Sequence, residues 1–227
     1  MKQYLGEAIR KGGYAAKQNL WPAIVLQVLA VALIFGYYNV SVVRSSLDRV
    51  GALNVGWSPW FAVMMTMVFA GVIPLTVEAF RAKFKGNSQR SIAQVVFTLL
   101  VWAMNGLITD RFYVLQSKVF GDELSFLTVL KKVLVDQFIW VPIYAVPVFT
   151  IAFLWRDSGF RGSILKERLE RKSFLERALP LMISNWAVWI PAVSVIYSFP
   201  LSLQLILMNL ILVFWSLILT FFVADEG

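Results

Sequence analysis

The chain contains no cysteine and no histidine. Without thiolates and imidazoles it cannot build a Cys/His zinc site, a His-ligated haem or a Ser-His-Asp triad, so these large groups of enzymes are excluded. We therefore expect no metal site, no cofactor and no catalytic site, and the protein is predicted not to be an enzyme. The missing cysteines leave the redox compartment open, because a chain without thiols can lie on either side of a membrane.

Charge is scarce as well. Only 15% of the 227 residues are charged and 59% are hydrophobic, against about 45–50% apolar residues in ordinary globular proteins. Five long stretches carry no charge, namely 18–43, 50–77, 91–109, 137–155 and 178–224. A helix needs roughly 20 apolar residues to cross the bilayer core. The sequence therefore predicts a multi-pass α-helical membrane protein, with the lipid bilayer as a partner.

The last uncharged stretch is too long for one crossing, because its 47 residues would form a helix of about 70 Å. Pro200 is the expected break, since proline lacks an amide proton and disfavours helical geometry in the residue before it. The predicted fold is an all-α transmembrane bundle, a single domain over 1–227. The fifth of its segments either spans the bilayer or is short or re-entrant, because it contains Pro191. The six predicted segments lie at about 20–43, 57–79, 91–112, 134–155, 180–198 and 201–223.

Basic residues are distributed unevenly along the chain. The 21 Lys and Arg residues exceed the 13 Asp and Glu residues and give a net charge of +8, which in a soluble chain would suggest nucleic acid as a partner. Here fifteen basic residues lie in 1–17, 81–90 and 156–177, and six lie in the alternate connections. Lys and Arg collect in cytoplasmic or matrix-side loops. We therefore expect both termini on that side and no nucleic-acid partner.

Two segments outside the predicted crossings are also basic. Residues 1–17 precede an apolar run about twice as long as the core of a signal peptide, so we predict a retained interfacial helix and no cleaved signal. Residues 156–178 mix apolar side chains with seven basic and four acidic ones. That composition fits either an amphipathic connector lying in the headgroup region or a solvated connector with ion pairs along a helix.

Acidic residues at the ends of the predicted segments are candidates for function, because an ionisable group inside a membrane is costly. Glu78 is expected to pair with Arg81, three residues later. Asp110 is expected to form an ion pair with Arg111 at the outer surface. Both pairs are more typical of structure than of a functional site.

Asp136 is the most informative acidic residue, because Gln137 and a 19-residue uncharged run follow it. In one interpretation it lies in the first turn of a helix, where the helix dipole favours it, and pairs with Lys132 four residues earlier. In the other, Asp136 and Gln137 face a water-filled bundle interior near its mouth. Both interpretations are open from the sequence.

Uncharged polar residues within the predicted segments have two uses. They line a narrow aqueous path, or they form hydrogen bonds between helices, which is the more common use. These residues are Gln27, Asn39, Gln94, Asn105, Asn185, Gln204 and Asn209. A nearby cluster of aromatic residues and prolines predicts a rigid, kinked element that serves packing first and gating second, and it consists of Trp186, Trp189, Pro191, Phe199 and Pro200.

Two of these features form longer patterns. Lys132, Asp136, Gln137 and Pro142 match K-x-x-x-D-Q-x-x-x-x-P, and this resembles a signature of the Mpv-seventeen family of small peroxisomal, mitochondrial and bacterial membrane proteins. Gly106, Phe112 and Tyr113 resemble another pattern of the family more weakly. Seven residues near the C-terminus match a second pattern of the family with similar spacing, namely Asn185, Trp186, Trp189, Pro191, Phe199, Pro200 and Trp215. The resemblance covers residues 100–222 and hardly touches 1–99.

The chain departs from the family pattern at three positions. Gln204 occupies a position where the family usually has arginine, Leu107 replaces a proline, and Phe112 replaces a frequent tryptophan. If the family arginine pairs with the aspartate of the Asp-Gln motif, that pair is absent here, although Gln204 could hydrogen-bond Asp136. The resemblance implies a small helical membrane protein that acts as a relatively unselective channel for small metabolites.

The leading functional hypothesis is a passive channel or pore for small hydrophilic solutes, within the bundle or at the centre of a homo-oligomer. Asp136 and Gln137 would shape its mouth, with Asn105, Asn185 and Gln204 as further pore candidates. The alternative is a structural or scaffolding subunit of a membrane complex. A membrane-embedded enzyme is a third hypothesis, and it requires two converging carboxylates. A bacterial or mitochondrial inner membrane is expected rather than a peroxisomal one.

Overall fold

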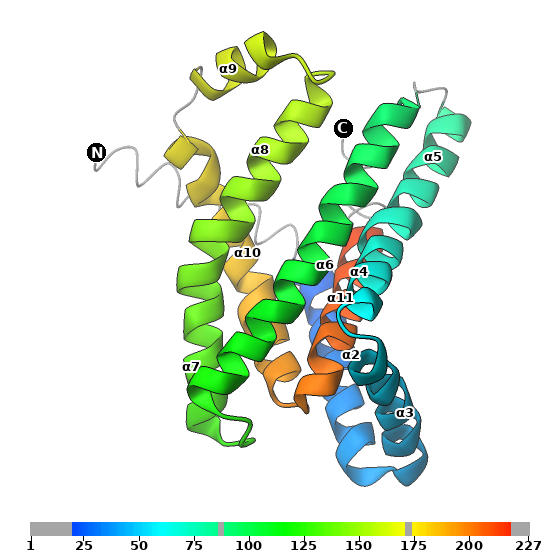
Figure 1. Cartoon of the computed structure of the whole chain (residues 1–227), viewed down its shortest axis with the longest axis vertical. Coiled ribbons are helices and arrows are strands. Elements are labelled where there is room, and N and C mark those ends of the chain that lie inside the picture. Colours follow the sequence, from blue (N-terminus) through cyan, green and yellow to red (C-terminus); the bar gives the residue numbers. More distant parts are fainter. Residues whose placement is uncertain (1–19, 86–88, 171–173, 219–227) are drawn as a thin grey trace.

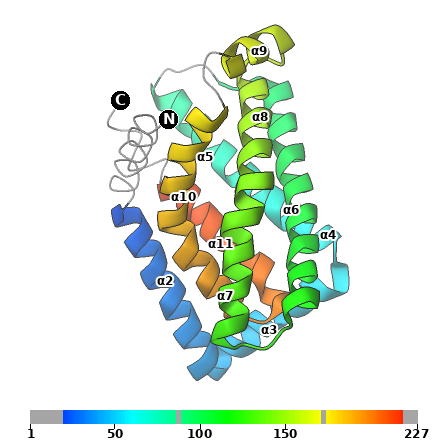
Figure 2. The ribbon, with the colours of Figure 1, turned by 90° about the vertical axis from the view of Figure 1, so that its left-hand side faces the viewer.

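The computed structural model of the chain describes residues 20–85, 89–170 and 174–218, and within these ranges it contains helices and no strand (Figure 1). The predicted all-α fold is confirmed, and the helices pack as a bundle. Seen from the side, α2, α10, the α7–α8 helix and α6 follow one another, and each contacts the next (Figure 2). The predicted interfacial helix 1–17 and the side chain of Trp215 lie outside the described residues.

The first two helices form a sharply bent pair. Helix α2 (Leu20–Asn39) is followed by α3 (Ser41–Trp57), and the axes differ in direction by 100°. Helix α3 carries Arg44, Asp48 and Arg49 and packs near the start of α11, where a Cβ on Gly51 would lie 3.0 Å from the Ser202 hydroxyl. The prediction of a loop after residue 43 is therefore wrong, because this charged stretch is helical and crosses one end of the bundle (Figure 1).

The next helix contains a π-helical turn. It is formed by α4 (Trp60–Thr66), the π-helix η1 (Met67–Val72) and α5 (Ile73–Lys85). The Ile73 amide bonds to the Val68 carbonyl, five residues back, where an α-helix would use a carbonyl four residues back.

Helix α6 (Ile92–Phe120) begins at a capping box formed by Ser91 and Gln94. It was predicted to end near residue 112, beside the charges of Asp110 and Arg111. It continues to Phe120 instead, and Asp110, which is 7% exposed, lies within it, 3.4 Å from the Arg111 guanidinium. This ion pair is therefore inside the helix and does not mark its end.

A second long helix with a π-helical part runs antiparallel to α6 (Figure 1). It comprises α7 (Phe126–Val135), the π-helix η2 (Asp136–Ala145) and α8 (Val146–Asp157), and α9 (Gly162–Glu170) follows. The helix was predicted to start at about residue 134. It starts at Phe126, because the Ser125 side chain accepts a hydrogen bond from the Thr128 amide and caps it.

Helices α10 (Phe174–Tyr197) and α11 (Leu201–Ile218) are separated by three residues that end at Pro200. Helix α11 is the central helix, since it contacts α2, α3, α4, α6 and α10. Leu203, Leu205 and Leu207 are at most 2% exposed. A helix that is apolar on all sides is suited to such a buried position.

Three helices are long and apolar enough to cross a membrane, namely Trp60–Phe84, Ile92–Phe120 and Phe126–Asp157. The bent pair α2–α3 adds a fourth if it is counted as one span, and the described apolar parts of α10 and α11 are shorter. Large apolar side chains are exposed on these helices, including Leu100, Phe126 and Ile143. Such a surface is compatible with a membrane protein. The count of six segments stays a prediction.

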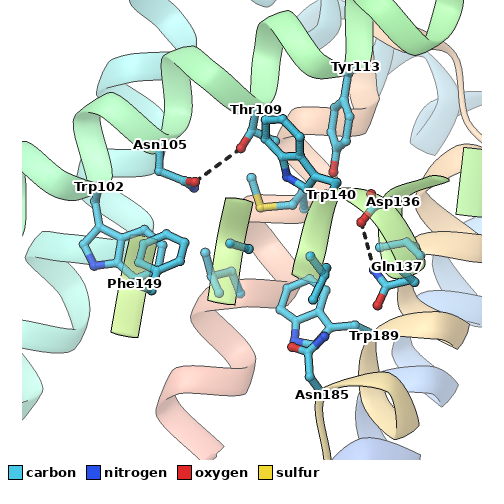
Figure 3. A pocket seen from close by; sticks show the side chains of 15 residues that line it. Trp102, Asn105, Thr109, Tyr113, Asp136, Gln137, Trp140, Phe149, Asn185 and Trp189 are labelled. Atoms are coloured by element: carbon cyan, nitrogen blue, oxygen red, sulfur yellow. Dashed lines mark hydrogen bonds between the residues drawn. The ribbon is translucent and has the colours of Figure 1, made fainter. Parts of the chain in front are cut away.

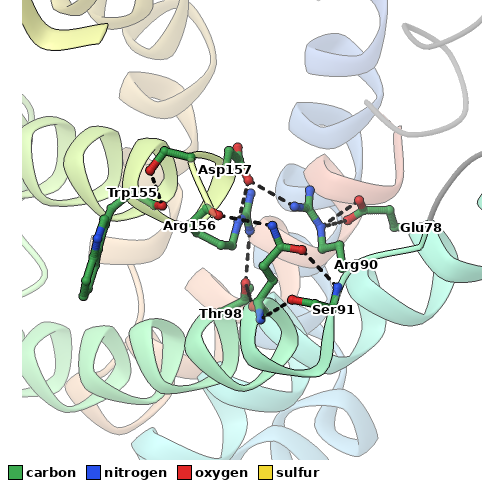
Figure 4. A network of polar contacts seen from close by, with 9 residues as sticks. Glu78, Arg90, Ser91, Thr98, Trp155, Arg156 and Asp157 are labelled. Atoms are coloured by element: carbon green, nitrogen blue, oxygen red, sulfur yellow. Dashed lines mark hydrogen bonds and ion pairs between the residues drawn. The ribbon is translucent and has the colours of Figure 1, made fainter. Parts of the chain in front are cut away.

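A network of charged residues joins three helix ends on the side of α9 (Figure 4). The Arg90 guanidinium lies 2.8 Å from Glu78 of α5 and 3.1 Å from Asp157 of α8. Burial lowers the pKa of Arg90, but both carboxylates raise it, and the net result is a pKa above the usual value. Glu78 therefore pairs with Arg90, and the predicted Glu78–Arg81 pair is replaced by one between separate segments.

Replacing Arg90 with glutamine is expected to lower the free energy of unfolding by about 1 kcal/mol, because partly exposed ion pairs are worth little. The loss should shrink at high salt, which screens such pairs. Denaturant titration in detergent micelles, followed by tryptophan fluorescence at low and high salt, measures both effects. Arg161→Gln is the matched control, since it makes the same charge change at an exposed residue. An equal, salt-independent loss in both variants would contradict the prediction.

Candidate functional site

A cavity of about 250 Å³ lies inside the bundle, between α6, the η2–α8 segment, α10 and α11 (Figure 3). Four of the five predicted pore residues line it, and they come from three separate helices. These four residues are Asn105, Asp136, Gln137 and Asn185. Polar residues that are up to 80 positions apart in the sequence thus line one cavity, which makes this cavity the candidate functional site.

The π-helix η2 forms one wall of the cavity. Asp136 begins it, and Pro142 lies inside it. At its end the Val146 amide bonds to the Val141 carbonyl, five residues back. Asp136 and Gln137 are adjacent and both buried, with 5% and 1% exposure. Wide helical turns of this kind occur frequently at functional sites, and here the turn coincides with the predicted Asp-Gln-Pro pattern.

Asp136 is held by neutral hydrogen-bond donors. The Tyr197 hydroxyl donates to Asp136 Oδ2 at 2.5 Å, and the Gln137 amide donates to Oδ1 at 2.9 Å. The Gln116 amide in turn donates to the Tyr197 hydroxyl at 2.7 Å. Asp136 forms no ion pair within the described part of the chain, because the ammonium group of Lys132 lies 3.6 Å from Asp122 instead. The predicted pairing with Lys132 is therefore wrong.

Gln204 has a different environment from the other predicted pore residues. It does not line the cavity, and its side-chain amide donates to the Phe199 carbonyl at 3.0 Å. This bond lies within the turn between α10 and α11, where Gln204 is in the first turn of the new helix. Gln204 thus stabilises the turn, and its amide does not bond Asp136. A role for Gln204 in a pore stays a prediction.

Sequence analysis did not single out Tyr197 and Gln116, although both belong to the Asp136 network. They lie 61 and 81 residues from their bonding partners, and no local pattern marks either position. Tyr197 is 1% exposed and Gln116 is 2% exposed. A tyrosine so deeply buried needs a partner for its hydroxyl group, and only the packing of α10 against η2 and α6 identifies that partner.

Aromatic rings make up much of the remaining wall. Trp102 packs against Phe149 with the ring centres 4.8 Å apart, and Trp140 stacks on Phe112 at 4.0 Å. Trp189 also lines the cavity, but it packs against no aromatic ring among the described residues. The sequence predicted that Trp189 serves mainly in packing.

The other members of the predicted aromatic cluster have packing roles. The Trp186 indole donates to the Gln137 carbonyl at 2.9 Å and so fixes α10 against η2. Phe199 is fully buried beside Tyr37, with ring centres 5.1 Å apart. Pro191 lies inside α10, which stays helical on both sides of it.

Several other polar residues of the predicted segments form hydrogen bonds between helices, which is the more common use of such residues in membrane proteins. Gln27 donates to the Val188 carbonyl, and Asn209 donates to the Thr66 hydroxyl at 3.0 Å. The lining of the cavity contains a single carboxylate, that of Asp136. In the ranges that the structure describes, no three acidic side chains come together to hold a metal ion.

Comparison of the chain with protein-family models, with curated proteins and with solved structures finds no match. The resemblance to the Mpv-seventeen family therefore depends on the sequence patterns alone. The structure shows where the Asp-Gln-Pro pattern lies: residues 136–142 belong to the π-helix that forms one wall of the cavity.

Proposed function

We propose that this membrane protein lets small hydrophilic solutes cross the bilayer by way of the cavity. The observation that carries the proposal is a buried carboxylate, Asp136, that lines the cavity and has no cationic partner among the described residues. A buried polar group costs about 1–3 kcal/mol for each hydrogen bond it lacks, and ionisable residues inside a membrane usually mark a path for a solute or an ion. A purely structural bundle would gain stability from an apolar side chain at this position.

The depth of the cavity supports this function. Asn105 lies 13 residues after the start of α6, which corresponds to about 20 Å along the helix axis. The polar lining is therefore near the middle of one of the helices long enough to span a membrane. A solute that reaches Asn105 and Asp136 has crossed roughly half of the apolar core.

On the side of α9, contacts between α6 and α8 lie next to the cavity. Along α6, Thr98 precedes Trp102 of the cavity by one turn, and Thr98 accepts a hydrogen bond from Arg156 at 3.0 Å. Along α8, Phe153 lies between Phe149 of the cavity and Arg156, and the Arg156 guanidinium is 4.6 Å from the centre of its ring. Passage of a solute would require α6 and α8 to separate at these contacts.

Flux of solutes into liposomes tests the proposal. Purified protein should pass small sugars and organic ions with an upper size limit, and filling the cavity by Ala145→Phe should reduce the rate at least tenfold. Ile143→Phe, two residues away on the 73% exposed outer surface of the same helix, is the matched control and should keep the wild-type rate. Equal rates in empty and protein-containing liposomes would overturn the proposal.

The alternative function, a structural subunit of a membrane complex, is favoured by the interhelical bonds of Gln27 and Asn209. It predicts no flux in the same liposomes and constant purification with partner proteins. The main proposal includes three further points. The protein belongs to the Mpv-seventeen family, it forms a homo-oligomer, and it lies in a bacterial or mitochondrial inner membrane with both termini on the cytoplasmic or matrix side. They are supported by the sequence patterns and by the distribution of Lys and Arg.

A further inference from the structure

We propose that the cavity recognises solutes that carry a primary ammonium group, with Asp136 as counter-ion and Trp189 as aromatic contact. As a statement about transport it rests on the proposed function, whereas binding can be tested without any flux. The charge, the hydrogen-bonding groups and the aromatic surface of the cavity each point to this class of ligand.

The charge of the cavity is the first observation. Asp136 supplies the only carboxylate of the lining, and the lining contains no lysine or arginine. Both groups that donate to Asp136, the Tyr197 hydroxyl and the Gln137 amide, are neutral. A carboxylate in a site of low polarity is stabilised most by a cation, and here the protein provides none. A cationic solute would complete the site.

Several buried or weakly bonded groups of the lining are acceptors. Gln137 Oε1 is buried and has no hydrogen-bond partner, and the two oxygens of Asp136 accept one bond each although a carboxylate has about four acceptor positions. Asn105 Oδ1 accepts only long bonds, of 3.4 Å from Tyr144 and 3.5 Å from Thr109. An alkylammonium group has three donors and no acceptor, so it can satisfy these acceptors.

The aromatic surface is the third observation. Cations bind favourably over the face of an aromatic ring, and tryptophan is the best of these rings. Trp102 and Trp140 each pack against another ring of the protein, whereas Trp189 lines the cavity without such a neighbour in the described ranges. In Figure 3, Trp189 lies beside Asn185 at the bottom of the view, and Gln137 lies next to Asp136 at the right. Because no aromatic ring of the described residues packs against Trp189, we assign the contact with the cation to this tryptophan.

The size of the cavity limits the ligand. A cavity of about 150 Å³ is known to hold benzene, so one of 250 Å³ has room for about ten non-hydrogen atoms. Small amino alcohols and short diamines fit this limit. The proposed ligand is thus a short, hydrophilic alkylammonium ion.

Binding to the protein in lipid nanodiscs, measured by tryptophan fluorescence at pH 7, tests the inference. Three probes of nearly equal size differ in charge: 4-amino-1-butanol is a cation, 1,4-butanediol is neutral, and 4-hydroxybutanoate is an anion. We expect the cation to bind at least tenfold more tightly than the diol, and the anion not to bind. Asp136→Asn should abolish the preference for the cation, and Trp189→Leu should weaken binding of the cation several-fold.

Asp110→Asn is the matched control, because Asp110 is also a buried carboxylate but lies outside the cavity. It should keep the wild-type preference for the cation. Equal binding of cation and diol by the wild-type protein would overturn the inference even if the Asp136 variant does not fold. Binding without flux would support the inference and contradict the proposed function, whereas flux without charge preference would do the reverse.

Discussion

Gly106→Ala is expected to be the most destabilising of the small substitutions in this chain, with a loss of about 3 kcal/mol in the free energy of unfolding. A Cβ at position 106 would lie 2.5 Å from the Ala62 carbonyl oxygen and 2.8 Å from Thr66. Both neighbours are fully buried, and one of the contacts is with backbone, so neither can move aside cheaply. Small residues allow membrane helices to approach in this way, and here the contact joins α4 to α6.

A graded series of glycine variants makes this prediction specific. At Gly71 the added Cβ would lie 2.9 Å from the end of the Leu99 side chain, which can rotate, and at Gly56 it would meet nothing within 4 Å. Unfolding titrations in mixed micelles should therefore rank the losses as Gly106→Ala, then Gly71→Ala, with Gly56→Ala neutral or stabilising. Equal stability of the Gly106 and Gly56 variants would show that α4 and α6 do not pack as described.

Tyr197→Phe should lower the free energy of unfolding by nearly as much, about 3 kcal/mol, although it removes a single oxygen atom. The hydroxyl of Tyr197 donates to Asp136 and accepts from Gln116, and all three residues are buried. Its removal leaves a carboxylate oxygen and an amide N–H without partners, and each unpaired buried group costs about 1–3 kcal/mol. The free energy of unfolding, again measured in mixed micelles, gives the size of the loss.

Tyr38→Phe is the control for Tyr197→Phe. The Tyr38 hydroxyl donates to the Ser198 carbonyl at 2.7 Å, but Tyr38 is 45% exposed. Water can replace that bond, so the expected loss is about 1 kcal/mol or less. A double-mutant cycle of Tyr197→Phe with Asp136→Asn should show strong coupling, because the two side chains share a hydrogen bond. Additive losses would mean that the hydroxyl does not bond the carboxylate.

The fold class could be predicted because it follows from local sequence. Uncharged stretches of about 20 residues favour transmembrane helices wherever they occur. The ends of helices were predicted less well, since they depend on individual side chains. Ser125 caps a helix that starts eight residues before its predicted start, and α6 continues past the charges of Asp110 and Arg111.

The candidate site could be predicted in part. Asp136 and Gln137 stand out because charge is rare around them, and both line the cavity. Gln204 also stands out as a polar residue in an apolar stretch, but its side chain hydrogen-bonds the Phe199 carbonyl in the turn before its helix. A polar residue in an apolar helix has the same sequence signature whether it faces a cavity or bonds a neighbouring carbonyl, so the two uses cannot be separated without the packing.

The sequence by itself determined that the chain is helical, rich in segments long enough for a membrane, and marked by one unusual carboxylate. These properties depend on hydrophobicity and charge over short windows. Only the tertiary structure decided that Asp136 bonds Tyr197, which in turn bonds Gln116. It also decided that, among the described residues, no cation pairs with Asp136 and no aromatic ring packs against Trp189 in the same cavity. Those facts depend on how α6, η2 and α10 pack against one another, which brings together side chains more than 60 residues apart.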